Sequence, residues 1–134
     1  MTAITVTATI GKKHYKTDLV YQDMSFLSDE GKENGGENLG PNPSALLASA
    51  LASCTAITLR MYADRKEYDV EKIEVNISFS RNDMNGATNS LFDRKIKIVG
   101  NINDENRARL LTIADKCPTH KVLTGKIVIN TTIE

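Results

Sequence analysis

The first part of the chain alternates apolar and polar residues in the pattern of β-strands. Thr5, Thr7 and Thr9 alternate with aliphatic neighbours, and residues 15–21 continue the pattern after a glycine-containing turn. Successive side chains of a strand point to opposite faces, so the alternation predicts strands across residues 2–27 with one buried and one solvated face.

Residues 28–43 interrupt this pattern. They combine closely spaced Gly, Pro and Asn residues with a single large apolar side chain, Leu39. Such a composition favours turns and left-handed backbone. A connection of this length inside one domain is usually functional or mobile, and we expect one of the two here.

The next segment predicts a long helix without charge on any side. No charged residue occurs over residues 43–59, which are rich in strong helix formers. Asn42 stands where it can cap the helix, and Pro43 stands at the first helical position. The predicted apolar stripe consists of Leu46, Leu47, Ala50, Leu51, Cys54, Ile57, Thr58 and Met61.

The other faces of this helix carry Ala and Ser. A helix that is uncharged all round is typically enclosed by protein. One sheet and one partner helix from a chain of this length would not cover it fully. We therefore expect a homodimer in which this helix is central, and we expect the helix to end where charge returns, at residues 60–67.

The second half predicts two strands, a helix and a final strand. Residues 69–81 alternate, residues 92–99 form the partner strand, and a turn-rich tip joins them. A helix opens at Asp104, with Asn103 as its cap, and stops near Cys117 because the residue before a proline disfavours the α conformation. Residues 126–133 predict the last strand. This order of elements is typical of an α+β fold.

Length and charge narrow the range of functions. The chain has 134 residues, which predicts one domain over residues 1–134. Its 17 Lys and Arg residues balance 17 Asp and Glu residues. This balance provides no positive patch for a phosphate backbone, so we do not expect nucleic acid as a partner.

We expect neither a membrane partner nor export. No segment approaches the roughly 20 mostly large apolar residues of a spanning helix. Residues 1–7 lack the charged start and apolar run of a signal peptide. These features predict a cytoplasmic protein, in a compartment that keeps thiols reduced.

Several common site types find little support. The glycines at 35, 36 and 40 precede a helix, but the Gly-Lys-Ser/Thr of a phosphate-binding loop and the G-x-G-x-x-G of a dinucleotide site are both missing. A serine hydrolase motif is missing, and only His14 and His120 could serve as bases. A metal site would need Cys117 and His120 together with Cys54 and His14, which are distant in the sequence, so the signal for a metal is weak. We expect no metal and no bound cofactor.

The two cysteines carry the strongest candidate chemistry and leave two interpretations open. A free cysteine is often a small buried hydrophobe, and Cys54 lies on the apolar stripe. Against this, Ser53 and Thr55 could donate hydrogen bonds to a Cys54 thiolate, and Lys116 beside Cys117 gives a partly cationic surrounding. A thiolate at neutral pH needs such stabilisation, because a free thiol has a pKa of about 8.5.

Two motifs resemble those of the OsmC/Ohr family of organic hydroperoxide reductases. They are residues 35–55, GGENLGPNPSALLASALASCT, and residues 114–121, ADKCPTHK. By resemblance, the fold is an α+β unit in which antiparallel sheets wrap around two central helices. The resemblance also implies an intertwined homodimer with its two active sites at the subunit interface.

The chemistry that the resemblance implies is a two-cysteine peroxidase acting in oxidative stress defence. Cys54 would attack the peroxide and become a sulfenic acid, and Cys117 would resolve it as a disulfide. An external dithiol of the dihydrolipoyl type would restore both thiols. Apolar surroundings of Cys54 would favour small hydrophobic peroxides.

The chain departs from the family pattern around the thiolate. Well-characterised members use an N-terminal arginine and a glutamate in the first turn of the cysteine helix, whereas here Ser44 and Ala45 occupy that turn and Arg60 is the first arginine. Glu37, Glu30 and His120 are the candidate supporting residues. Substitute cations are Lys12, Lys13, Lys16, Arg60, Arg81 and Arg94.

These departures keep other functions open and predict a weaker or differently arranged peroxidase. The main alternative is a non-catalytic dimer of the same fold that binds a small apolar ligand at its interface. A further alternative is another thiol chemistry, such as acyl transfer.

Overall fold

The computed structural model describes residues 2–134, so Met1 of the predicted domain lies outside the described residues. The chain forms two compact units, and the boundary between them along the sequence lies between Leu47 and Ala48. Each unit is described by itself.

The first unit contains a three-stranded antiparallel sheet. Its strands are β1 (Thr7–Thr9), β2 (Thr17–Tyr21) and β3 (Met24–Ser28), in the order β1-β2-β3. The alternating pattern therefore predicted the strands correctly but not their length, because β1 covers only three residues. A tight turn with Gln22 at φ 55° joins β2 to β3.

The loop after β3 is ordered around the carboxylate of Asp29. This side chain is 2 % exposed and accepts hydrogen bonds from the backbone N–H groups of Tyr15, Glu30, Glu37 and Leu39. Burial raises the pKa of Asp29, but the four backbone donors together outweigh it and lower the pKa. A short 3₁₀ helix, η1 (Lys32–Asn34), lies within the loop.

Helix α1 (Pro43–Arg65) begins and ends close to the predicted residues. Asn42 Oδ1 accepts a hydrogen bond from Ala45 N at 2.8 Å, which confirms the predicted cap. The predicted stripe, however, is not the buried face: Ile57 and Met61 are 54 % and 67 % exposed. The residues of α1 that this chain buries are Leu51, Thr55, Leu59, Tyr62 and Ala63.

By length and composition, α1 is apolar enough to cross a membrane. This corrects the expectation that no segment approaches a spanning helix. That expectation counted large apolar side chains, whereas the many alanines of α1 also make it apolar. One such helix is weak evidence for a membrane, because the core helix of a soluble protein has the same composition.

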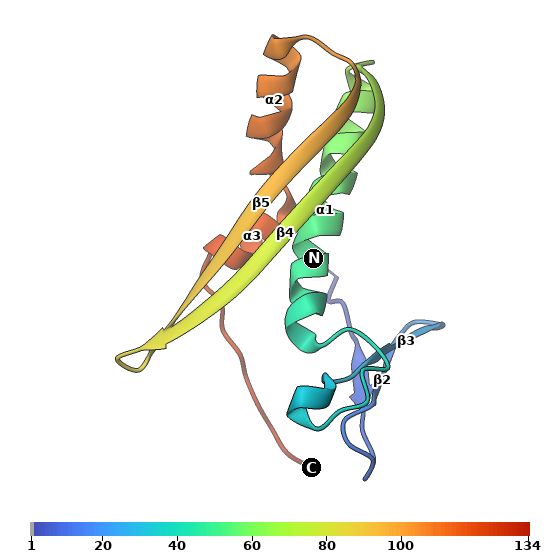
Figure 1. Cartoon of the computed structure of the whole chain (residues 1–134), viewed down its shortest axis with the longest axis vertical. Coiled ribbons are helices and arrows are strands. Elements are labelled where there is room, and N and C mark those ends of the chain that lie inside the picture. Colours follow the sequence, from blue (N-terminus) through green and yellow to red (C-terminus); the bar gives the residue numbers. More distant parts are fainter. Residues whose placement is uncertain (1) are drawn as a thin grey trace. The chain divides into compact units, whose positions relative to one another are not determined.

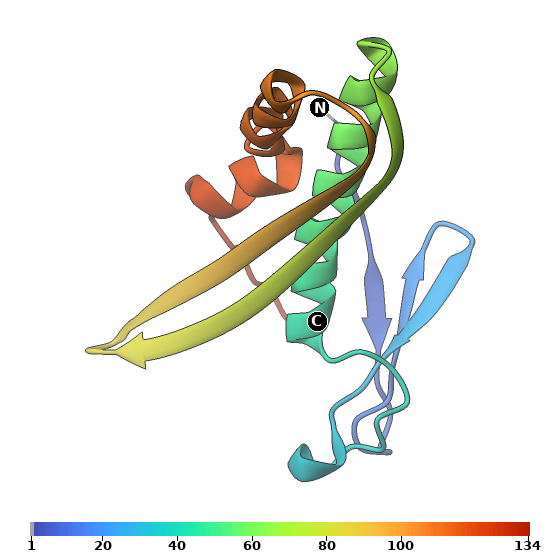
Figure 2. The same ribbon diagram turned by 45° about the horizontal axis from the view of Figure 1, so that its top comes forward.

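A long antiparallel hairpin of β4 (Asp69–Met84) and β5 (Ala87–Asn101) dominates the second unit. Asn85 and Gly86, both at positive φ, form its turn. The hairpin twists along its length, and the helices of this unit lie on one of its faces (Figures 1 and 2). Both strands extend further than the alternation predicted, because the ladder continues through polar residues to the turn.

The core of the second unit lies between α1, α2 (Asp104–Ala114) and the hairpin. Leu59, Leu110 and Ala114 are at most 1 % exposed, and Ile96 and Ile98 of β5 pack against this cluster. Asn103 caps α2 by accepting a hydrogen bond from Asn106 N, as predicted. This core fixes the helices that carry the two cysteines.

The C-terminal region differs from the prediction in two ways. Residues expected to form a connector after Cys117 form α3 (Pro118–Thr124), because Pro118 suits the first helical position that follows its cap, Cys117. The expected strand over residues 126–133 is not formed, since these residues pair with no strand of the described chain. Their aliphatic side chains are exposed, Ile129 to 82 %.

Candidate active site

The two cysteines meet in the second unit. Cys54 lies on α1 and is partly exposed, whereas Cys117 caps α3 and is completely buried. Both are free thiols, and the Cys117 side chain is a neighbour that lowers the pKa of Cys54. The fold thus joins two residues that are far apart in the sequence.

The break between α2 and α3 supplies further donors to both sulfurs. Thr119 N donates to Cys54 Sγ at 3.5 Å, and His120 N donates to Cys117 Sγ at the same distance. Pro118 causes this geometry, because it ends α2 and starts α3, so that the first amides of α3 are unpaired within the helix. The sequence signal for this arrangement is Cys117-Pro118 itself.

The surroundings of the two thiols shift their pKa values in opposite directions. Burial raises the pKa of Cys54, but hydrogen bonds from Cys117, Thr119 and Thr58 outweigh it, so the pKa is lowered. Burial and the neighbouring Cys54 sulfur raise the pKa of Cys117. Of the two thiols, Cys54 is therefore the one that loses its proton more readily, and Cys117 is the one that keeps it to higher pH.

Arg94 of β5 contacts both segments that carry the cysteines. Its Nη1 donates to Thr55 Oγ1 at 3.1 Å, and its Nη2 donates to Asp115 Oδ1 at 2.8 Å. The same Nη2 lies 3.4 Å from His120 Nδ1. A guanidinium only donates, so this contact is a hydrogen bond in the tautomer that carries no proton on Nδ1.

Sequence reasoning included Arg94 and His120 among its candidates but did not connect them. The available signal was the position of Arg94 in β5, on the same inward face as Phe92 and Ile96. An arginine on an apolar face requires buried partners. Nothing in the sequence named those partners, because Thr55 and Asp115 come from other elements.

The other candidates from the sequence have partners of their own. In the first unit, Glu37 pairs with Lys13 at 3.3 Å, and Glu30 accepts a hydrogen bond from Asn34. In the second unit, Arg60 bonds to Asp64 and to the carbonyl of Val70, and Arg81 pairs with Asp83 near the hairpin turn. Among residues 2–134, no group of three or more His, Cys, Asp or Glu side chains could hold a metal ion.

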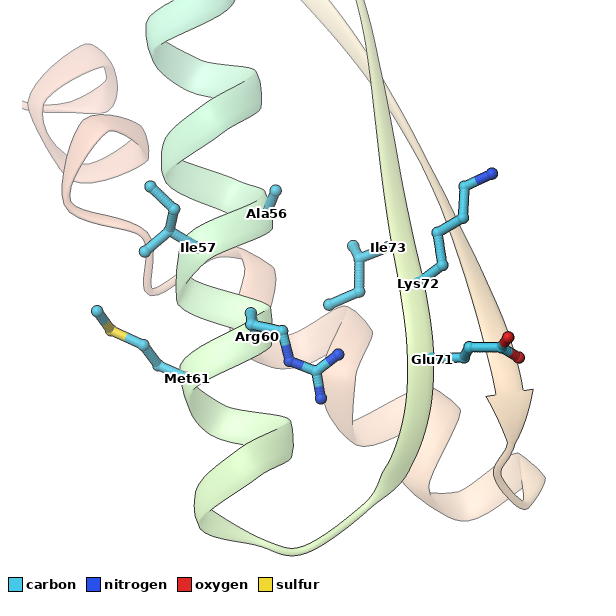
Figure 3. Close-up of a pocket in the computed structure, with 7 residues that line it drawn as sticks. All are labelled: Ala56, Ile57, Arg60, Met61, Glu71, Lys72 and Ile73. Atoms are coloured by element: carbon cyan, nitrogen blue, oxygen red, sulfur yellow. The ribbon is translucent and has the colours of Figure 1, made fainter.

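Two apolar cavities adjoin the helices of the second unit. One, of about 420 Å³, lies between α1 and β4, where Arg60 extends toward the strand and Ile73 toward the helix (Figure 3). The other, of about 400 Å³, has Arg94 and His120 on its wall. Its remaining lining residues are Leu51, Ser90, Phe92, Ile96, Leu111, Leu123 and Thr124.

Solved structures of known proteins share this fold. An OsmC-like protein from Mycoplasma pneumoniae superposes with a TM-score of 0.80 at 22 % identity, over 92 % of this chain and 89 % of that one. An organic hydroperoxide resistance protein from Legionella pneumophila has a TM-score of 0.72 at 20 % identity, with 93 % and 91 % covered. The organic hydroperoxide resistance protein OhrB of Bacillus subtilis has a TM-score of 0.66 at 21 % identity, with 92 % of each chain covered.

These structural similarities establish the fold, and the match of the sequence to a family model establishes the family. No curated protein sequence matches the chain. The model of the OsmC-like protein family matches residues 35–132, which include both cysteines and the whole of the second unit up to its last two residues. The chain therefore belongs to the OsmC-like protein family.

Proposed function

We propose that the protein reduces organic hydroperoxides with Cys54 as the attacking thiolate and Cys117 as the resolving thiol. The observation that carries this proposal is the asymmetric pair: Cys54, a partly exposed residue whose thiol has a lowered pKa, lies beside Cys117, a buried residue whose thiol has a raised pKa. Relatives of this fold described as organic hydroperoxide resistance proteins support the substrate class and a role in stress defence.

The first step forms an S–O bond and breaks the peroxide O–O bond. The Cys54 thiolate attacks one peroxide oxygen and becomes a sulfenic acid, while the alkoxide leaves and takes a proton from water to give the alcohol. In the second step, Cys117 attacks the Cys54 sulfur, and the sulfenic hydroxyl leaves with the Cys117 proton as water. An external dithiol, of the dihydrolipoyl type, then supplies two electrons and two protons by thiol–disulfide exchange.

The working form in this proposal is a homodimer in the cytoplasm. Ile57 and Met61 of α1 are largely exposed in the single chain, and the aliphatic residues of segment 126–133 have no strand partner among residues 2–134. A second copy is the occupant that would cover both, because a free strand can add to an open sheet edge. Sedimentation or light scattering at micromolar concentration tests this, and a monomer would contradict it.

Intact-mass measurement tests the peroxidase proposal. Reduced protein mixed with an alkyl hydroperoxide should lose two hydrogens as the disulfide forms. Cys54→Ser should show no change, and Cys117→Ser should stop at a sulfenic acid that a dimedone-type reagent traps. If the wild-type protein keeps its mass at millimolar peroxide, the proposal is wrong.

The two cavities favour one second candidate, the binding of a small apolar ligand without catalysis. Apolar side chains contribute to both walls together with a few polar or charged groups, as in typical ligand sites. Native mass spectrometry should then show a co-purified small molecule while both thiols stay inert to peroxide. An empty protein with reactive thiols would exclude this candidate.

A further inference from the structure

We propose that Arg94 is a positioning residue that holds Cys117 and Thr119 against Cys54, and so controls the rate of disulfide closure. This inference rests on the proposed thiol chemistry of the same site. Within residues 2–134, Arg94 donates no hydrogen bond to either sulfur; its partners are Thr55, Asp115 and His120.

The placement of these partners gives Arg94 its role. Thr55 directly follows Cys54 on α1, whereas Asp115 and His120 lie on either side of Cys117. One guanidinium therefore connects the cysteine of α1 with the segment that carries the second cysteine. Within the part of the chain that the structure describes, no other residue of β5 donates side-chain hydrogen bonds to both segments.

Burial makes the Thr55 end of the connection rigid. Arg94 is 13 % exposed and lies in the inward-facing row of β5, and Thr55 is completely buried. Thr55 is held in turn, because its hydroxyl donates to Leu51 O at 2.7 Å. A planar guanidinium can donate in two directions at once, which a lysine ammonium on a flexible stem does not reproduce.

The electrostatics of the pair depend on this placement. The pKa of Cys54 is lowered by groups on the α2–α3 segment, Cys117 and Thr119, and by Thr58 of its own helix. If that segment drifts from α1, two of these three donors weaken. Loss of Arg94 should therefore raise the pKa of Cys54 toward that of an ordinary thiol, as well as slow closure.

The variants Arg94→Met and Arg94→Lys test the inference. Arg94→Met keeps the apolar stem and removes the donors, and Arg94→Lys keeps the charge but loses the fork. The matched control is Arg107→Met, because Arg107 of α2 likewise connects a helix to β5, through the Ile98 carbonyl, but this hydrogen bond involves neither cysteine segment. Far-UV circular dichroism and melting temperature check that each variant folds.

Closure is measured with oxidised glutathione, which needs no peroxide. The Cys54 thiolate attacks the glutathione disulfide and releases one glutathione; Cys117 then attacks the mixed disulfide and releases the second. Arg94→Met should close about 10- to 100-fold more slowly than wild type, since a misplacement near 1 Å has effects of that size. Arg94→Lys should fall between the two, and Arg107→Met should match wild type.

The pH profile of Cys54 alkylation gives the second readout. Its midpoint should rise in Arg94→Met and stay unchanged in Arg107→Met, a difference that lost stability alone would not produce. If Arg94→Met does not fold, Asp115→Asn is used instead. It removes the negative charge of the exposed partner of Arg94, and disulfide closure should again be slower than in the wild type.

The outcomes separate this inference from the proposed function. A wild-type protein that closes with glutathione but ignores peroxide contradicts the peroxidase and leaves Arg94 testable. Folded Arg94 and Asp115 variants that close at the wild-type rate with an unchanged alkylation midpoint overturn the role of Arg94.

Discussion

Asp29 in the first unit and Cys54 in the second both hold an acidic group whose pKa is lowered by hydrogen-bond donors. Asp29 is buried, and four backbone N–H groups at 2.8–3.3 Å satisfy both of its oxygens. Cys54 is partly exposed, and its backbone bond is long, at 3.5 Å.

The comparison shows that a lowered pKa alone does not identify a reactive site. The four donors of Asp29 order a loop, because one carboxylate accepts hydrogen bonds from four backbone N–H groups of the first unit. The donors of Cys54 lower the pKa of a partly exposed residue, and one of them, Cys117, is itself a thiol. Exposure and the nature of the donor separate structural from chemical anions.

The largest effect is expected from Cys54→Ser. This variant should lose disulfide formation and peroxide consumption completely, because a serine hydroxyl is not ionised at neutral pH. Its melting temperature should stay near that of the reduced wild type, since the hydroxyl can still accept from Thr119 N. Mass spectrometry and calorimetry measure the two quantities, and residual peroxide turnover would contradict the assignment of Cys54.

Asp29→Asn should show the opposite behaviour, a marked loss of stability. Whichever oxygen becomes NH₂ then faces two backbone N–H donors, because Oδ1 accepts from Tyr15 and Glu30 and Oδ2 from Glu37 and Leu39. The matched control is Glu30→Gln, whose side-chain oxygen can still accept its single bond from Asn34. Thermal denaturation should show a clearly larger drop for Asp29→Asn than for this control.

The pH dependence of stability should identify Asp29 independently. Its folded-state pKa lies below the unfolded value. Its contribution to stability is therefore complete above the ordinary carboxyl pKa of about 3.9 and is lost as the pH falls through the lowered value. Denaturation series between pH 6 and about pH 2 should converge for wild type and Asp29→Asn, and curves that stay parallel would contradict this.

Removing the thiol donor should raise the pKa of Cys54. Among the groups that lower this pKa, Cys117 makes the largest contribution, and Cys117→Ala removes its thiol. The alkylation midpoint of Cys54 should then move toward that of free cysteine while the backbone bond from Thr119 remains. Rates of iodoacetamide modification against pH measure the shift, and an unchanged midpoint would show that Cys117 does not stabilise the thiolate.

The smallest effect concerns a neutral acceptor of backbone N–H, the Asn42 cap. Asn42→Ala should cost about 1 kcal/mol, the usual value of an N-cap. Urea denaturation should show a lower midpoint with an unchanged slope. If Asn42→Ala lost as much stability as Asp29→Asn, an exposed neutral acceptor and a buried carboxylate would contribute equally to stability. That result would contradict the special role assigned to the buried Asp29 carboxylate.

Local signals in the sequence determined the positions of α1, α2, the hairpin and the two cysteine motifs, but not that of α3. Asn42 and Pro43 start α1, Asn103 starts α2, and Pro118 ends the second helix near Cys117, because capping and proline sterics act within a few residues. The alternation of β4 and β5 similarly reflects the two-residue period of a strand.

Only the tertiary structure decided which residues meet. The contact of Cys54 with Cys117, the three partners of Arg94 and the buried face of α1 all join elements that are distant in the chain. The expected strand over residues 126–133 failed for the same reason, since a strand forms only where another edge receives it. Local geometry is fixed by neighbouring residues, whereas the site depends on packing between elements, which no local pattern encodes.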